Sequence, residues 1–487
     1  MATEQSLLRA ATGSGSADWE GLRSLLRGDV VLPSDTGYDL ARQLQNKEYD
    51  VIDPQAVAYC ESPYDLRACV RFAQENDLPV HTRSGGHSFN GWSTGPGLVV
   101  DLSRINHTLV CNGSVRIGAG TQSVDALDTL KPTGTQLITG TFPTVSAGGF
   151  LSGGGLGWQT RKFGVGSDRV VSARVLLSDG RIVRCSETHD PDLYWAVRGG
   201  GGGNFGIVVD FDVRPIEAPL LVGYDTMWGF DQAADVLTAW QEWCVSAPND
   251  LGSSLVVLPQ MFSPHDAPII NVWGAYHGPK AELEAALDEF TERVGVQPVK
   301  RTVGDPLPYS EVMHERLCDD KSVAECHRTG HNPLAVGHRH PFTRQSYALT
   351  DRPVTRAEAA RLLDAWDPRR DNERYLLCIA LGGAANEVGR TETAYVHRDA
   401  QFLTGYQMAV REPVPAPETV ADITAWADGA AAALAPLSSG SYINFPSSRT
   451  PGDWGTSYYG ENHPRLLEVK RQYDPDDFFR HSQSIGS

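Results

Sequence analysis

The sequence predicts an α+β fold with two lobes, and three features of the chain support this prediction. From about residue 31 to about 215, glycine-rich stretches alternate with short apolar strands. Beyond about residue 216, glycine thins out and long helices alternate with strands, as in proteins whose helices pack on an antiparallel sheet. After Gly440, glycine and aromatic residues become frequent again. We therefore expect four segments: a mobile lead-in at 1–30, a first lobe at 31–215, a substrate-binding second lobe at 216–439, and a return to the first lobe at 440–487.

The composition is that of a globular protein that binds a ligand. Of the 487 residues, 41% are hydrophobic and 21% are charged, so the chain can bury a large core. The formal net charge of −18 disfavours nucleic acid and membrane surfaces as partners, because their phosphate groups would be repelled. The 49 glycines occur in clusters, which indicates contact between the backbone and a ligand.

The sequence also predicts where the protein resides. No apolar run approaches the ~20 residues that span a bilayer, and residues 1–20 lack the charged and apolar regions of a signal peptide. The eight cysteines show no pairing pattern, and without a secretory signal we expect free thiols. These features, with a composition rich in Ala, Gly and Arg, predict a cytoplasmic bacterial protein.

The first lobe begins with a strand–helix unit after Asp53. Ser62-Pro63-Tyr64-Asp65 supplies an N-cap serine, a proline at the first helical position and an acid in the first turn. The helix leads into a short strand at 78–80. Its buried face is expected to consist of Leu66, Cys69, Val70 and Ala73.

The remaining elements follow from apolar spacing and turn residues. In the first lobe, strands are expected at 98–102, 115–120, 170–177, 181–184 and 207–213, with a turn at Asp179-Gly180 and a short helix through Val124, Leu127 and Leu130. In the second lobe, helices are expected at 231–243, 280–294, 355–366 and 419–434, and strands at 254–257, 269–273, 375–381 and 403–410. The helix at 355–366 opens with a capping box of Thr355 and Glu358 and buries Leu362 and Trp366.

A turn at Thr82-Arg83-Ser84-Gly85-Gly86-His87-Ser88 is the first candidate binding site. Its two glycines let the backbone approach a ligand and expose successive N–H groups, which suits a pyrophosphate. His87 ends the turn, so it can reach the rest of a bound dinucleotide. The turn therefore predicts where a dinucleotide would be held and chemically tethered.

Further glycine-rich stretches lie near residues 118, 148–157 and 199–206. A Rossmann site needs a single G-x-G-x-x-G motif within a parallel βαβ unit, and the run at 153–157 follows no such unit. Several loops that converge on one extended cofactor explain the pattern better. The alternative is that these glycines only form tight turns.

The chain resembles the berberine-bridge-enzyme-like family of FAD-linked oxidases, which shares the PCMH-type FAD-binding fold of vanillyl-alcohol oxidase. Matching stretches cover about 55–215 and 375–487. The motifs that carry the resemblance are Arg83-Ser84-Gly85-Gly86-His87, Pro143-Thr144-Val145 with the glycines at 148–149 and 153–155, Leu193-Tyr194-Trp195-Ala196-Val197-Arg198-Gly199-Gly200, Asn204-Phe205-Gly206-Ile207-Val208, Tyr442-Ile443-Asn444, and a tail from Trp454 to Ile485.

The resemblance implies an FAD cofactor that His87 carries covalently through the 8α-methyl group of the isoalloxazine. It implies a cofactor site made of His87, Arg83, Ser84, Gly85, Gly86, Ser88, Gly140, Thr141, Val145, Gly148, Gly149, Ser152, Gly153, Gly154, Gly155, Gly157, Gly206, Ile207, Val208, Tyr442 and Asn444.

Two positions depart from the family pattern. Many members carry a cysteine directly before the Pro-Thr-Val motif, which forms a second bond to flavin C6, whereas this chain has Phe142. We therefore predict a single covalent tether. Phe150 stands where plant members often have histidine.

Three residues are the catalytic candidates. Tyr442 matches a tyrosine that the family places over the flavin, and a tyrosine with a lowered pKa could remove a proton from the substrate. Thr404 stands where plant members have a catalytic glutamate, and threonine is no general base. Tyr406 lies two residues further along the same predicted strand, so it shares a face with Thr404 and is predicted to project toward the flavin.

A cluster rich in histidine and cysteine lies in the second lobe. Zinc sites use compact pairs, and only the spacing of His327 and His331 fits, so we predict no metal and interpret the cluster as a polar loop on the substrate side. The cluster comprises His314, Cys318, Cys326, His327, His331, His338 and His340.

The resemblance thus implies an oxidase for a small organic, natural-product-like substrate, as in antibiotic biosynthesis. Hydride would pass from substrate carbon to flavin N5, and O₂ would be reduced to H₂O₂, by alcohol oxidation, desaturation or oxidative cyclisation. A flavin dehydrogenase, an oxygenase, and an inactive ligand-binding scaffold are the alternatives. The sequence determines neither the substrate nor the oligomeric state.

Overall fold

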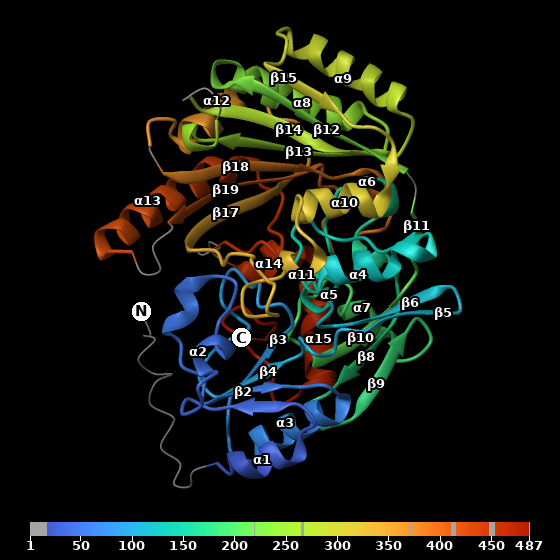
Figure 1. Ribbon diagram of the computed structural model, residues 1–487, viewed down its shortest axis with the longest axis vertical. Coiled ribbons are helices and arrows are strands. Elements are labelled where there is room, and N and C mark those ends of the chain that lie inside the picture. The colour runs from blue at the N-terminus through green and yellow to red at the C-terminus, as the bar shows by residue number, and fades with distance from the viewer. Residues whose placement is uncertain are drawn as a thin grey trace.

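The computed structural model describes residues 17–218, 220–263, 267–370, 372–410, 415–447 and 453–486. Figure 1 shows two lobes, with the first lobe below and the second lobe, built on a large sheet, above it. Helices and sheets are mixed in both lobes, so the predicted two-lobed α+β fold is confirmed. Within the described residues, no helix combines the length and the apolar character needed to cross a membrane.

Two sheets form the centre of the first lobe. The first contains β1 (Asp29–Val31), β2 (Ala56–Tyr59), β3 (Val80–Arg83) and β4 (Leu98–Asp101), in the order β1-β2-β4-β3, with β2 and β3 parallel to β4. The second is antiparallel and has the order β5-β6-β10-β8-β9. Its strands are β5 (Thr108–Cys111), β6 (Ser114–Gly118), β8 (Val170–Leu176), β9 (Ile182–Ser186) and β10 (Ile207–Val213).

Short helices and a two-stranded pairing complete the first lobe. The helices are α1 (Trp19–Leu25), α2 (Tyr38–Ala41), α3 (Pro63–Glu75), α4 (Ser123–Leu130), α5 (Ala147–Ser152), α6 (Thr160–Phe163) and α7 (Pro191–Ala196), and β7 (Thr135–Gln136) pairs with β11 (Ile216–Glu217). Helix α3 confirms its predicted signals: Ser62 caps it by accepting from the Asp65 N–H, and the predicted apolar face is buried against the first sheet.

The second lobe is built on one long antiparallel sheet with the order β15-β12-β14-β13-β18-β19-β17. Its strands are β12 (Leu220–Gly229), β13 (Leu251–Leu258), β14 (Ile269–Tyr276), β15 (Lys300–Val303), β17 (Phe342–Thr350), β18 (Glu373–Ala380) and β19 (Phe402–Val410), and β16 (Leu307–Pro308) pairs with β12. The helices are α8 (Ala233–Ser246), α9 (Lys280–Val294), α10 (Tyr309–Cys318), α11 (Val323–Cys326), α12 (Arg356–Trp366) and α13 (Pro417–Leu434).

Each side of this sheet has its own core. Helices α8, α9, α12 and α13 cover the outer face, where Leu376 and Cys378 of β18 join their core. The inner face looks toward the first lobe (Figure 1), and Tyr347, Leu349 and Leu403 there belong to a core that also contains residues of the first lobe. The inner face of the sheet therefore bounds the space between the two lobes.

Three expectations need correction. The predicted mobile lead-in falls partly on residues 1–16, outside the described residues, but Trp19–Leu25 forms α1 with Leu22 buried. The short strand predicted at 78–80 instead runs from Val80 to Arg83. Strands β12, β15 and β17 were not predicted, because glycine and polar residues interrupt their apolar pattern.

The expectation of free thiols is wrong for two of the eight cysteines. Cys318, at the end of α10, and Cys326, at the end of α11, form a disulfide across a Cα separation of 5.4 Å. The other six described cysteines are free. Because disulfides are uncommon in a reducing cytoplasm, the cysteine count no longer supports the predicted location.

A polar clasp joins the lobes beside the predicted binding turn. We use this name for the segment 43–50 of the first lobe and the segment 328–344 of the second. Arg339 pairs with Asp50 at 2.7 Å and Arg344 with Glu48 at 2.7 Å. On the other side of the same segment, the Gln45 N–H donates to Gly86 O at 2.9 Å. The clasp therefore connects the second lobe to the backbone of the turn.

The C-terminal segment packs on the first lobe through α14 (Trp454–Tyr459) and α15 (His463–Tyr473). Lys470 is 4% exposed, and its ammonium group donates to Asn204 O at 2.8 Å, Phe479 O at 2.6 Å and Asp474 at 2.7 Å. One buried cation thus ties the glycine stretch near 204 to the end of the chain.

Replacing this cation should destabilise the protein strongly. We expect Lys470→Met to lower the free energy of unfolding by about 3 kcal/mol or more, because the buried carboxylate of Asp474 loses its counter-charge. Denaturant unfolding measures this. The control is Arg471→Met, which removes the exposed cation next along α15 and should cost less than about 0.5 kcal/mol. Equal losses in both variants would contradict this account of Lys470.

Candidate active site

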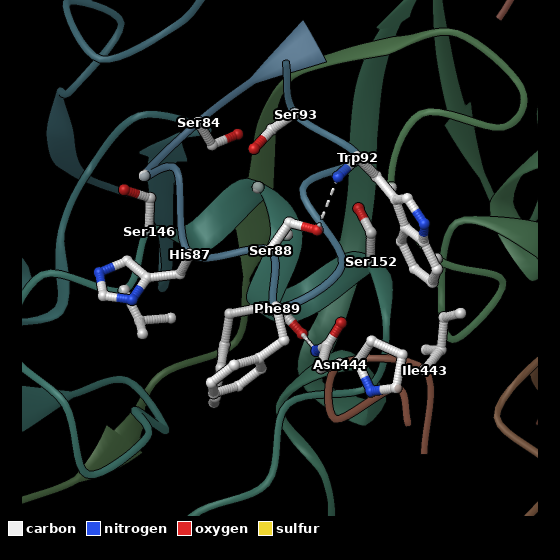
Figure 2. Close-up of a pocket in the computed structure, with 18 of the residues that line it drawn as sticks. Ser84, His87, Ser88, Phe89, Trp92, Ser93, Ser146, Ser152, Ile443 and Asn444 are labelled. Atoms are coloured by element: carbon white, nitrogen blue, oxygen red, sulfur yellow. Dashed lines mark hydrogen bonds between the residues drawn. The ribbon is translucent and has the colours of Figure 1, made fainter. Parts of the chain in front are cut away.

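A cavity of about 420 Å³ lies between the first lobe and the inner face of the second-lobe sheet. Its walls come from the turn at 84–89, the glycine stretches at 140–158 and 201–208, the sheet strands β13, β17, β18 and β19, and the tail at 442–446 and 479–481. In Figure 2, His87, Ser88 and Phe89 lie on the turn, and Ile443 and Asn444 approach from the C-terminal tail. Segments distant in sequence therefore meet around one cavity.

Most of the sequence-predicted cofactor residues line this cavity. They are Ser84, Gly85, Gly86, His87, Ser88, Gly140, Thr141, Val145, Gly148, Gly149, Ser152, Gly157, Gly206, Ile207, Val208, Tyr442 and Asn444.

Four predicted cofactor residues do not line it, and each has a structural role instead. Arg83 is buried, pairs with buried Asp101 and donates to Ala41 O at 2.8 Å. Gly153, Gly154 and Gly155 lie close against other side chains of the protein. A Cβ at Gly153 would lie 2.2 Å from Asn444 Oδ1, and Gly154 and Gly155 have φ of +123° and +89°. The three glycines leave room for the side chains of Asn444, Tyr395 and Phe150, respectively, rather than for a ligand.

The backbone of the turn is suited to a ligand rich in oxygen acceptors. Within the described part of the chain, the N–H groups of Gly85, Gly86 and His87 donate to no protein acceptor. A Cβ at Gly149 or Gly202 would contact no other protein atom, so packing does not require glycine there, and both positions line the cavity. Successive free amides and missing side chains are what a pyrophosphate and a flat ring require.

Hydroxyl groups add further donors to the same wall. Ser84, Ser93, Ser146 and Ser152 line the cavity together (Figure 2). The Oγ atom of Ser93 is buried and has no hydrogen-bond partner among the described residues. A buried hydroxyl is costly to leave unpaired, so a bound ligand would complete its bonding. Ser93 and Ser146 were not predicted, because isolated serines carry no pattern.

His87 is held in a neutral state at the cavity wall. Its Nε2 atom lies 2.8 Å from Thr144 Oγ1. Burial lowers the pKa of His87 to about 3, and His340 and Arg328 lower it further in the same direction. The imidazole therefore keeps a free lone pair at physiological pH.

Phe142 fills the position beside His87. The two rings meet edge to face with centroids 5.1 Å apart, and the other side of Phe142 contacts His340 at 5.3 Å. The side chain is a packed hydrocarbon between two imidazoles. It offers no nucleophile to a ligand in the cavity.

Tyr442 lies at the cavity with its hydroxyl oxygen held by two donors. The Gly155 N–H donates to this oxygen at 2.8 Å and Asn444 Nδ2 at 3.0 Å. Burial raises the pKa of Tyr442 to about 12, although both hydrogen bonds act to lower it. The expectation of a lowered pKa is therefore wrong for this environment. Because the oxygen accepts two hydrogen bonds, the hydroxyl proton remains available to donate to another group.

The predicted orientation of β19 is wrong. Thr404 and Tyr406 do share a face, but it is the outer one, and Tyr406 donates to Leu362 O of α12 at 2.7 Å. The side chain that lines the cavity from β19 is Gln407, which the sequence argument missed. Alternation along a strand identifies residues that share a face and does not say which face is inside.

The histidines and cysteines that are clustered in the sequence have separate partners in the structure. His340 lines the cavity, whereas His327 pairs with Asp125 at 2.9 Å and Cys318 and Cys326 bond to each other. Among the described residues, no three histidine, cysteine or acidic side chains converge as metal ligands. Trp92, also missed, lines the cavity and stacks on His481 at 4.4 Å.

Two known protein families match segments of the chain that line the cavity. The FAD binding domain family matches residues 54–186, and the family described as berberine and berberine like matches residues 441–486. These two matches contain the turn with His87 and the tail with Tyr442. The FAD-binding domain thus supplies most of the cavity wall described above.

Relatives match along almost the whole chain. YgaK, an uncharacterised FAD-linked oxidoreductase of Bacillus subtilis, is 28% identical over 470 residues, which are 95% of this chain and 98% of the relative. (R)-6-hydroxynicotine oxidase of Paenarthrobacter nicotinovorans is 28% identical over 481 residues, covering 94% of this chain and 97% of the relative.

Solved structures share the fold. A chitooligosaccharide oxidase has a TM-score of 0.83 at 24% identity, covering 96% of this chain and 98% of that chain. A BBE-like protein of Physcomitrella patens has a TM-score of 0.85 at 20% identity, with the same coverage. The chain thus carries an FAD binding domain and a berberine-like domain, and along almost its whole length it is similar to berberine-bridge-enzyme-like FAD-linked oxidoreductases.

Proposed function

We propose that this protein is a covalent flavoprotein oxidase that acts on a small organic substrate. When bound, FAD would accept a hydride from a substrate carbon at N5 and pass the two electrons to O₂, giving H₂O₂. The observation that carries the proposal is a neutral histidine on a turn with free amides, facing the same cavity as a doubly hydrogen-bonded tyrosine. The names of two relatives, a hydroxynicotine oxidase and a chitooligosaccharide oxidase, support oxidase chemistry.

We infer that His87 holds FAD through its Nδ1 atom. If Thr144 Oγ1 accepts a hydrogen bond from Nε2–H, the lone pair of the neutral ring lies on Nδ1. The low pKa of His87 keeps this lone pair free of a proton. Because Phe142 offers no thiol, we expect one tether only.

We further infer that Tyr442 accepts or relays the substrate proton. The two donors to its oxygen would stabilise the phenolate, which favours proton acceptance once the pH or a bound ligand compensates for burial. Substrate oxidation could be of an alcohol, a desaturation or an oxidative ring closure, and the substrate a natural product. The Tyr442–Asn444–Gly155 arrangement is compatible with each.

The tether can be tested directly. We expect acid-denatured wild-type protein to keep its flavin, on a peptide that contains His87 and not on the peptide that contains Phe142. His87→Ala should release the flavin, and Thr144→Val should lower the covalent fraction because the ring loses its orienting partner. His189→Ala, which alters an exposed histidine, is the control and should keep its flavin. Flavin that leaves the wild-type chain on denaturation would contradict the tether.

The role of Tyr442 predicts a pH dependence. Because its pKa is raised to about 12, the phenolate fraction should rise about tenfold per pH unit below that value. Anaerobic flavin reduction by the best substrate should therefore accelerate from pH 7 to pH 9, and Tyr442→Phe should be slow and nearly independent of pH. Tyr406→Phe, whose hydroxyl bonds to α12, should keep the wild-type profile.

Two outcomes would count against these roles. A wild-type reduction rate that stays constant from pH 7 to pH 10 would exclude Tyr442 as the base. Re-aeration separates the reaction types: one H₂O₂ per flavin supports an oxidase, and no peroxide supports a dehydrogenase that uses another acceptor.

A further inference from the structure

We propose that the substrate side of the cavity selects an uncharged, flat and largely apolar ring compound with one hydroxyl group near Gln407. This inference rests on the proposed function and names the substrate class of the same site. It is carried by the side chains that the second-lobe sheet and the C-terminal tail present to the cavity.

The sheet presents hydrocarbon to the cavity. Leu377 and Ile379 of β18 line the cavity, while Leu376 and Cys378 between them pack against the outer helices. Trp158 lines the neighbouring wall. A ligand that lies against this sheet gains free energy by covering apolar surface.

The tail and β17 add a wall of aromatic rings. Tyr347 and Phe445 meet edge to face with centroids 5.1 Å apart, and Phe445 stacks on Tyr442 at 5.9 Å. Gly405 makes room for this wall, because a Cβ there would lie 2.0 Å from Cδ1 of Tyr347. Flat rings pack well against such a surface through offset or edge contacts.

Polar partners on this side are few. Ser254 Oγ already accepts the indole N–H of Trp158 at 3.0 Å, and the Tyr442 oxygen already accepts two hydrogen bonds. Among the described residues, the Gln407 side chain makes one long hydrogen bond, in which the Tyr347 hydroxyl donates to Oε1 at 3.4 Å. The Gln407 amide is therefore available to a hydroxyl group of the substrate, whereas each sugar ring brings several hydroxyls, most of which would lose their bonds to water.

The described residues on the substrate side of the cavity also supply no counter-charge. Among the described residues that line it, Arg480 is the only arginine, lysine, aspartate or glutamate. Arg480 is exposed and follows Phe479, which packs in the core of the first sheet rather than against the second-lobe sheet. Burial lowers the pKa of each histidine in the lining, so all four are neutral at pH 7: His81, His87, His340 and His481.

A charged substrate would therefore be buried without a partner. Burying an unpaired ammonium or carboxylate is costly, because the charge loses its solvation and gains no partner, so the site should bind charged compounds weakly. An uncharged ring compound loses no such solvation. The wall chemistry thus discriminates against cations, anions and oligosaccharides alike.

The test compares matched probes on the flavin-loaded enzyme. Binding is followed by the change in flavin absorbance with para-methylbenzyl alcohol (uncharged), para-aminomethylbenzyl alcohol (cation), para-hydroxymethylbenzoate (anion) and cellobiose. We expect the uncharged alcohol to bind at least about tenfold more tightly than each of the other three. The inference is overturned if any of those three binds as tightly, or if the uncharged alcohol gives no absorbance change at millimolar concentration.

A substitution should reverse the preference. Leu377→Glu places a carboxylate on the sheet, so the cationic probe should then bind at least about tenfold more tightly than it does to the wild-type enzyme, and the anion should bind no better. Leu377→Gln, of the same size and uncharged, should keep the wild-type order of the three benzyl probes. Equal cation affinity in the two variants would contradict the placement of Leu377 against the substrate.

The two proposals fail in different ways. Flavin content is measured from the absorbance of the denatured protein before any probe is added. A chain without flavin would contradict the proposed function. A flavin-loaded chain that binds cellobiose or a charged probe most tightly would contradict only the inference about substrate class.

Discussion

The structure depends on one shared core between its two lobes. The inner face of the second-lobe sheet is only partly apolar, and its buried residues pack with residues of the first lobe and the tail rather than with helices of their own. Neither surface could be left open to water without exposing that core. Glycines leave part of this space unfilled, because a Cβ at Gly149 or Gly202 would meet no other protein atom and both positions line the cavity.

Much of the fold could be predicted from local signals. Helices α3 and α12 carry their own caps, Ser62 and Thr355, and an apolar face at helical spacing, so neither needs the rest of the chain to be recognised. Strand β17 carries no such signal, because Arg344, Gln345 and Ser346 interrupt its apolar pattern. It is recognised as a strand only from its pairing with β19 and its packing against the first lobe. Long-range packing, rather than propensity, defines such a strand.

The candidate site likewise contains residues that local sequence signals identify and residues that only long-range packing places. The turn with His87 could be located because paired glycines and a histidine have a chemical meaning in sequence. The misplaced Tyr406 and the missed Gln407 differ by one residue, and which of them meets the cavity depends on helices α12 and α13, which cover one face. The pKa of Tyr442 depends on burial, and the disulfide between Cys318 and Cys326 depends on the contact between two short helices. No sequence motif indicates either feature.

The polar clasp restrains how far the two lobes can move apart. Its arginines come from the second lobe, and the segment they hold also supports the carbonyl of Gly86. A hinge that swung the lobes apart would break both ion pairs and pull on the turn at the same moment. Separating the lobes would therefore cost both ion pairs together with the packing of the shared core, which favours a closed arrangement of the two lobes around the cavity.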